Sequence, residues 1–144
     1  MKHNRILALV AAVFVTALSL GTAEVCHGQT NDEYQAALEL LLTSTNKQLP
    51  MDYGNGQVNT KLVREGKYVV YYYLCDEPRY NLDRMNRNIH LLTETILKEV
   101  NSDEFFISYL RKTCKNAGVG IGYCYIGKES GKTARVYIPV EKLK

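Results

Sequence analysis

The hydrophobic pattern is dominated by one run, Lys67 to Cys75, whose interior residues are apolar or aromatic on both faces. It contains no glycine or proline. Strands that are apolar on both sides are usually covered by other elements and paired along both edges. We therefore expect residues 67–75 to form the central strand of a small sheet.

Before this run, the pattern predicts a helix followed by a half-buried strand. The helix is expected over 30–47, because Thr30 is a capping residue and Pro50 disfavours helical geometry just before it. The glycine-rich residues 51–57 are expected to form a turn or loop. Apolar and polar residues then alternate over 58–64, which is typical of a strand that pairs with the central one as a hairpin.

After this run, apolar residues recur every three or four positions over 83–100, which predicts one long helix. Its apolar stripe is expected to pack on the sheet through Ile89, Leu92 and Ile96. Ser102 can cap a second helix, which should end near Gly118.

Two strands, 119–126 and 133–140, are predicted at the end of the chain. The order is therefore α-β-β-α-α-β-β. This order favours an α+β fold, a small and mostly antiparallel sheet with helices packed on one face. A chain of 144 residues is long enough for one such domain but short for two.

Residues 1–23 have the three parts of a secretory signal peptide: a basic start, an apolar stretch and small residues before position 23. We expect cleavage after Ala23, leaving 24–144 as a single α+β domain that is periplasmic or extracellular. An uncleaved membrane anchor is the alternative; after cleavage no stable membrane insertion is expected.

The formal charge of +3 includes Lys2 and Arg5, which lie in the predicted signal peptide. Without them, the chain has 16 basic and 15 acidic residues, so it is almost neutral. Proteins that bind nucleic acids need a concentrated basic face, so the balance argues against a nucleic-acid partner.

Four cysteines remain in the mature chain, and an even number in an exported protein favours two disulfides. The candidates are Cys26, Cys75, Cys114 and Cys124. If strands 67–75 and 119–126 run antiparallel, Cys75 approaches Cys114 and leaves Cys26 for Cys124; we favour this pairing. If they run parallel, Cys75 with Cys124 is the natural pair. No zinc-ligand spacing occurs, and we expect no metal site and no cofactor.

No catalytic arrangement stands out in the sequence. Cys114 and His90 would make a thiol–imidazole pair, but a cysteine on the apolar stripe of a helix in an exported protein is more often disulfide-bonded. Asp76 and Glu77 end the central strand, where a small enzyme could carry its site. Charged residues there usually solvate a turn, so a non-catalytic binding or structural module is favoured over an enzyme.

Tyrosines are unusually frequent, with eleven in the chain and no tryptophan. Core packing accounts for many of them, but those on strands that point away from the helices would form an exposed aromatic surface. Such a surface would bind another exported or envelope protein. The candidate residues are Tyr71, Tyr72, Tyr73, Tyr123, Tyr125 and Tyr137.

Several signatures over residues 35–140 occur together. They are Asn-x-Gln-Leu-Pro at 46–50, Y-x-Y at Tyr71 and Tyr73, a helical Cys114, and Y-x-Y at Tyr123 and Tyr125. In this order they resemble a group of short exported bacterial proteins of uncharacterised function. Such proteins carry a cysteine after the last strand, whereas residues 140–143 contain none, which leaves the disulfide pairing open. The resemblance implies export but no activity.

Overall fold

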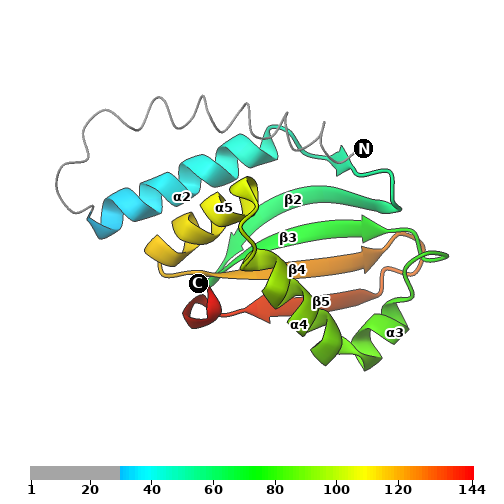
Figure 1. Cartoon of the computed structure of the whole chain (residues 1–144). Coiled ribbons are helices and arrows are strands. Elements are labelled where there is room, and N and C mark those ends of the chain that lie inside the picture. Colours follow the sequence, from blue (N-terminus) through cyan, green and yellow to red (C-terminus); the bar gives the residue numbers. More distant parts are fainter. Residues whose placement is uncertain (1–29) are drawn as a thin grey trace.

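The structure, a computed structural model, describes residues 30–144, which form a five-stranded sheet with helices laid against it (Figure 1). In spatial order the strands are β1 Met51–Asp52, β2 Gln57–Glu65, β3 Tyr68–Cys75, β4 Gly120–Gly127 and β5 Thr133–Ile138. The helices are α2 Asn31–Asn46, α3 Leu82–Arg87, α4 Ile89–Val100, α5 Phe105–Asn116 and the short η1 Val140–Lys142. The predicted α+β class is confirmed. The expected signal peptide and Cys26 lie outside the described residues.

The apolar run forms β3, the middle strand of the sheet, as predicted. β3 pairs antiparallel with β2 but parallel with β4, with Tyr68 opposite Gly120. The antiparallel arrangement favoured from the sequence is wrong. Three helices separate the two strands, and this long crossover returns the chain to the start of β3 before β4 begins.

α2 begins where the sequence predicts, because Thr30 and Glu33 form a reciprocal capping box. At its other end, Asn46 joins the helix to the sheet. Its side-chain amide donates to the Leu62 carbonyl oxygen at 2.6 Å and accepts from the Leu62 amide at 2.9 Å. Asn46 thus satisfies both backbone groups of one residue in β2, as a neighbouring strand would.

The predicted long helix is interrupted at Asn88, which separates α3 from α4. The Asn88 side chain donates to the carbonyl oxygen of Arg84 at 2.9 Å, a local bond that competes with helix continuation. α5 starts at Phe105 and not after Ser102. The Ser102 carbonyl instead accepts from the buried Arg111 guanidinium at 2.7 Å, which holds the turn between α4 and α5.

The core lies between the sheet and helices α2, α4 and α5. The predicted stripe of α4 does face it: Ile96 and Val100 are buried, whereas Ile89 and Leu92 are half-buried. A second, smaller cluster around Val70 lies on the opposite face of the sheet. These two faces are called the helix face and the open face below.

Candidate functional site

The six candidate tyrosines do not share one surface, because successive side chains of a strand point to opposite faces. Tyr71 and Tyr73 of β3 and Tyr123 and Tyr125 of β4 point to the helix face, and Tyr72 and Tyr137 to the open face. The two Y-x-Y motifs are brought together, since the parallel register sets Tyr71 opposite Tyr123 and Tyr73 opposite Tyr125.

On the helix face the tyrosine rings are stacked against one another. The ring centroids of Tyr71 and Tyr123 are 5.4 Å apart, and those of Tyr73 and Tyr125 are 5.6 Å apart. The Tyr73 and Tyr123 rings are almost parallel, with an interplanar angle of 4°. Tyr53, which follows β1, adds a fifth ring 6.5 Å from Tyr73. We call Tyr53, Tyr71, Tyr73, Tyr123 and Tyr125 the tyrosine stack.

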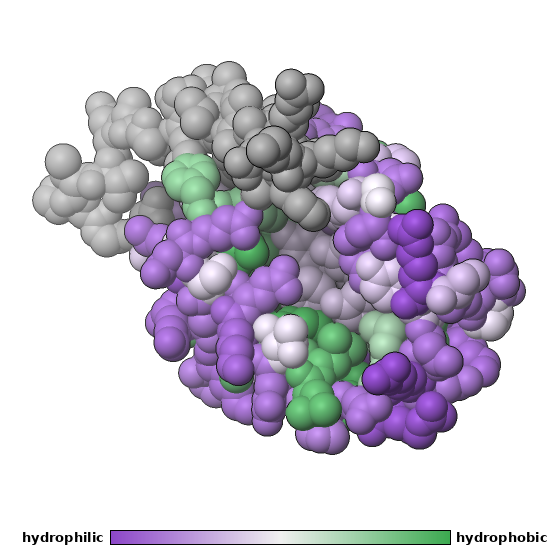
Figure 2. Space-filling view, turned by 45° about the vertical axis from the view of Figure 1, so that its right-hand side comes forward, coloured by the Kyte–Doolittle hydropathy of each residue, from purple (hydrophilic) through white to green (hydrophobic). Residues whose placement is uncertain are grey.

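The stack is only partly covered, and the molecular surface is hollowed by a recess whose colour matches the hydropathy of tyrosine (Figure 2). Tyr53 and Tyr73 are half-buried, whereas Tyr71, Tyr123 and Tyr125 are largely covered. Figure 2 shows the recess as a pale area with strongly hydrophilic side chains on either side and an apolar patch along its lower edge. Pale colours mark residues near the middle of the hydropathy scale, where tyrosine lies. The stack therefore presents part of its aromatic surface to solvent.

The side of α4 next to the stack carries Leu92 and Glu99, which are seven residues apart and lie along the same side of the helix. Burial raises the pKa of Tyr71, Tyr73 and Tyr123, and the Glu99 carboxylate adds to the rise in each case. These hydroxyls are therefore neutral hydrogen-bonding groups near neutral pH.

Two acceptors at the stack lack donors among residues 30–144. Glu99 has no hydrogen bond or ion pair, and burial, with the nearby acid Glu104, raises its pKa. Asn59, opposite Tyr73 on β2, is 2 % exposed, and its side-chain oxygen has no hydrogen-bond partner. A buried unpaired acceptor is costly, which applies to the Asn59 oxygen, whereas the Glu99 side chain is exposed and its charge is open to a partner.

On the open face, aromatic and charged side chains are joined by hydrogen bonds, an ion pair and a cation–π contact. The Tyr72 ring lies 4.3 Å from the Lys61 ammonium, and its hydroxyl donates to Glu65. The Arg135 guanidinium is 3.8 Å from the Glu65 carboxylate and donates to the Tyr137 hydroxyl at 3.1 Å.

The alternate glycines Gly120 and Gly122 of β4 make room for the aromatic rings on this face. A Cβ on Gly120 would lie 2.8 Å from the Tyr68 ring, and one on Gly122 would lie 3.0 Å from the Tyr137 ring. The Tyr68 and Tyr137 rings pack on each other with centroids 4.9 Å apart. On the open face, the Tyr68 and Tyr137 rings therefore occupy the room above the two glycines and form a small packed aromatic cluster.

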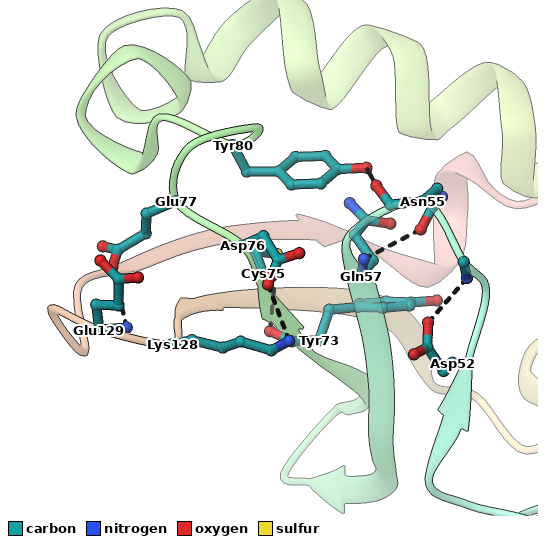
Figure 3. A network of polar contacts seen from close by, with 11 residues as sticks. Asp52, Asn55, Gln57, Tyr73, Cys75, Asp76, Glu77, Tyr80, Lys128 and Glu129 are labelled. Carbon is teal, nitrogen blue, oxygen red and sulfur yellow. Dashed lines mark hydrogen bonds and ion pairs between the residues drawn. The ribbon is translucent and has the colours of Figure 1, made fainter.

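The carboxylates that end β3 hold the β4–β5 turn (Figure 3). Asp76 pairs with Lys128 at 2.9 Å. Glu77 accepts from the backbone amides of Glu129 and Ser130 at 3.0 and 2.9 Å, and from the Ser130 hydroxyl. His90 is exposed on α4 and has no hydrogen bond or ion pair with either carboxylate or with Cys114. Asp76 and Glu77 thus stabilise the β4–β5 turn, and they form no site together with His90 or Cys114.

We expect the contribution of Glu77 to the stability of the β4–β5 turn to be lost in acid. Hydrogen bonds from Ser130 lower the pKa of Glu77 below its ordinary 4.5, so the stabilisation is present above that value and is lost as the pH falls below it. Glu77→Gln should therefore be less stable than the wild type at pH 7, and the difference should shrink towards pH 3. Thermal unfolding across this range measures it, with the exposed Glu94→Gln as control; an unchanged difference would contradict the assignment.

Three cysteines lie within the described residues, and all three are buried and unpaired. The alternative pair of Cys75 and Cys124 is excluded in this fold, because Cys75 points to the helix face and Cys124 to the open face. The favoured Cys75–Cys114 bond is also not formed. Burial raises the pKa of Cys75 to about 11 and that of Cys114 to about 12, so both thiols are un-ionised at neutral pH. The proposed partner of Cys124, Cys26, lies outside the described residues.

Within residues 30–144, no group of three or more His, Cys, Asp or Glu side chains could hold a metal ion. Over the same range, none of the helices has the length and apolarity to cross a bilayer. Sequence reasoning missed Tyr53, Asn59 and Glu99. Only the helical spacing of Glu99 from Leu92 could have suggested that it flanks the sheet.

No family model matches the sequence, and no curated protein matches it. Solved structures do share the fold. A candidate secreted protein from Pseudomonas aeruginosa is 13 % identical, with a TM-score of 0.61 over 82 % of this chain and 100 % of its own. The pilotin EpsS of the type 2 secretion system of Vibrio vulnificus is 12 % identical, with a TM-score of 0.51 over 78 % of this chain and 97 % of its own. At such low identity, the likeness establishes the fold alone.

Proposed function

We propose that this protein is an exported, non-catalytic binding module of the bacterial cell envelope, and that it holds a segment of another exported protein in the recess over the tyrosine stack. The observation that carries the proposal is the stack itself: five tyrosine rings packed together, two of them half-buried and so partly open to a partner. Tyrosine offers a large, rigid contact area together with a hydrogen-bonding group, and it is enriched at protein interfaces.

The recess is preferred to the open face for a chemical reason. On the open face, Tyr72, Glu65 and Arg135 bond to one another. In the recess, the side-chain oxygen of Asn59 and the carboxylate of Glu99 accept no hydrogen bond from the described residues, so a bound segment could donate to them without displacing an existing donor. The fold shared with a candidate secreted protein and a secretion-system pilotin agrees with an envelope role.

Site-specific photocrosslinking in the native host tests the proposal. A photoreactive residue at Leu92, half-buried on the side of α4 that carries Glu99, should yield a defined adduct with another exported protein, whereas one at Leu40, exposed on α2, should not. Tyr73→Ser should abolish the adduct, and Tyr137→Ser on the open face should preserve it. Thermal unfolding confirms that both variants are folded. An adduct that survives in folded Tyr73→Ser, or one formed equally from Leu40, would refute the recess as the binding site.

A further inference from the structure

The recess has a negatively charged side chain, Glu99, beside its aromatic rings. Glu99 is exposed to an approaching partner and has no cation beside it among residues 30–144. The charged group that acts on it is another acid, Glu104. Its field also reaches the hydroxyls of all five tyrosines of the stack. An uncompensated negative charge therefore lies beside an array of aromatic rings.

A second observation indicates what the recess lacks. The Asn59 side chain is 2 % exposed, and its oxygen accepts no hydrogen bond. Its strand register places it directly beside Tyr73 on the helix face. The site thus combines one buried unpaired acceptor, one exposed carboxylate without a cation among residues 30–144, and aromatic rings. A group that donates several hydrogen bonds and carries positive charge would complement it.

We infer that the recess receives the guanidinium group of an arginine from the partner's bound segment, with Glu99 as its counter-ion and the accessible rings of Tyr53 and Tyr73 as its aromatic contact. A guanidinium offers five donors in one plane, pairs with carboxylates and packs favourably on tyrosine faces. The ammonium of a lysine would supply the charge but not the planar stacking. This inference rests on the proposed function and specifies the chemistry of the partner.

The direct test uses N-acetyl-arginine amide as the probe, and N-acetyl-citrulline amide, its neutral analogue, as control. In protein with carbon-13-labelled tyrosine rings, the arginine probe should shift the Tyr53 and Tyr73 signals saturably, with the Tyr72 and Tyr137 signals on the open face unchanged. The citrulline probe should bind about tenfold more weakly, the equivalent of about 1.4 kcal/mol. Equal binding of the two probes overturns the inference. So does the absence of saturable shifts up to on the order of 100 mM, because even a weak charge-assisted contact is visible there.

The matched variants are Glu99→Gln and Glu94→Gln, two acids on opposite sides of α4. Glu99→Gln should lower the affinity for the arginine probe about three- to tenfold. This loss is within the range of a partly exposed charge pair beside an aromatic ring. Glu94→Gln should leave binding unchanged. Equal binding by the wild type and Glu99→Gln overturns the inference. Glu99 bonds to none of residues 30–144, so the substitution leaves no orphaned partner there.

The photocrosslinking experiment separates failure of this inference from failure of the proposed function. If Tyr73→Ser abolishes the Leu92 adduct while Glu99→Gln leaves its yield unchanged, the recess binds a partner and the arginine inference is wrong. If Tyr73→Ser leaves the adduct intact, the recess is not the binding site, and the proposed function fails with it. If both substitutions reduce the adduct and Glu94→Gln does not, both proposals are supported.

Discussion

Gly120→Ala is expected to cost about 3 kcal/mol of stability or more, as severe overpacking of a core does. A Cβ at this position would lie 2.4 Å from the carbonyl oxygen of Ile138 and 2.8 Å from the Tyr68 ring. The ring can move, but the carbonyl belongs to the backbone of β5, next to the paired residues Ile121 and Ile138. Relieving the clash would therefore distort the pairing of β4 with β5. Equilibrium unfolding in urea measures the loss.

Gly122→Ala is the matched control, because Gly122 lies two residues further along the same strand and points to the same face. Its Cβ would meet the Tyr137 ring at 3.0 Å and a Val70 methyl at 3.1 Å. Both neighbours are side chains that can shift, so a loss of about 1 kcal/mol is expected. Alanine is otherwise favoured over glycine inside a strand, so a clash must account for any loss. Equal losses at the two positions would show that the backbone contact does not decide the effect.

Ile96→Ala should destabilise the protein by about 2–5 kcal/mol, the range found for large-to-small substitutions in cores. Ile96 is 2 % exposed and packs α4 against the helix face of the sheet. Truncation would remove apolar contacts and leave a cavity that the rigid sheet beneath cannot fill. Thermal or urea unfolding of the same protein preparation reports the change.

Leu91→Ala serves as the comparison on the same helix. Leu91 is 52 % exposed and points away from the core, so its truncation should change stability by about 0.5 kcal/mol or less. A small loss at Ile96, or a large one at Leu91, would mean that α4 presents a different face to the sheet.

Local patterns predicted most of the individual elements. Thr30 begins α2, the run from Tyr68 to Cys75 forms the middle strand, and the α4 stripe faces the core. These features depend on side-chain periodicity and capping, which act over a few residues. The break at Asn88 was missed, because only its backbone leaves the helical region, at φ −114° and ψ 30°, while the apolar stripe continues past it. The two-residue strand β1 was missed because it is too short to show a period.

The candidate site was predicted only in part. The Y-x-Y motifs identified four tyrosines of the stack, but not that they face the helices together. That outcome depends on the parallel register of β3 and β4, which pairs Tyr71 with Tyr123. Tyr53 and Asn59 reach the stack through β1 and β2, and Glu99 through α4, elements that are distant from both motifs in the chain.

The sequence by itself determined the order of the longer elements, the α+β class and the presence of an apolar central strand, because these follow from local spacing and composition. The tertiary structure decided the direction of β4, the separation of Cys75 from Cys124 and the division of the tyrosines between two faces. Each of these depends on strand register, and a shift of one residue moves every side chain to the other face. Register is fixed by the packing of the whole domain, so no short segment encodes it.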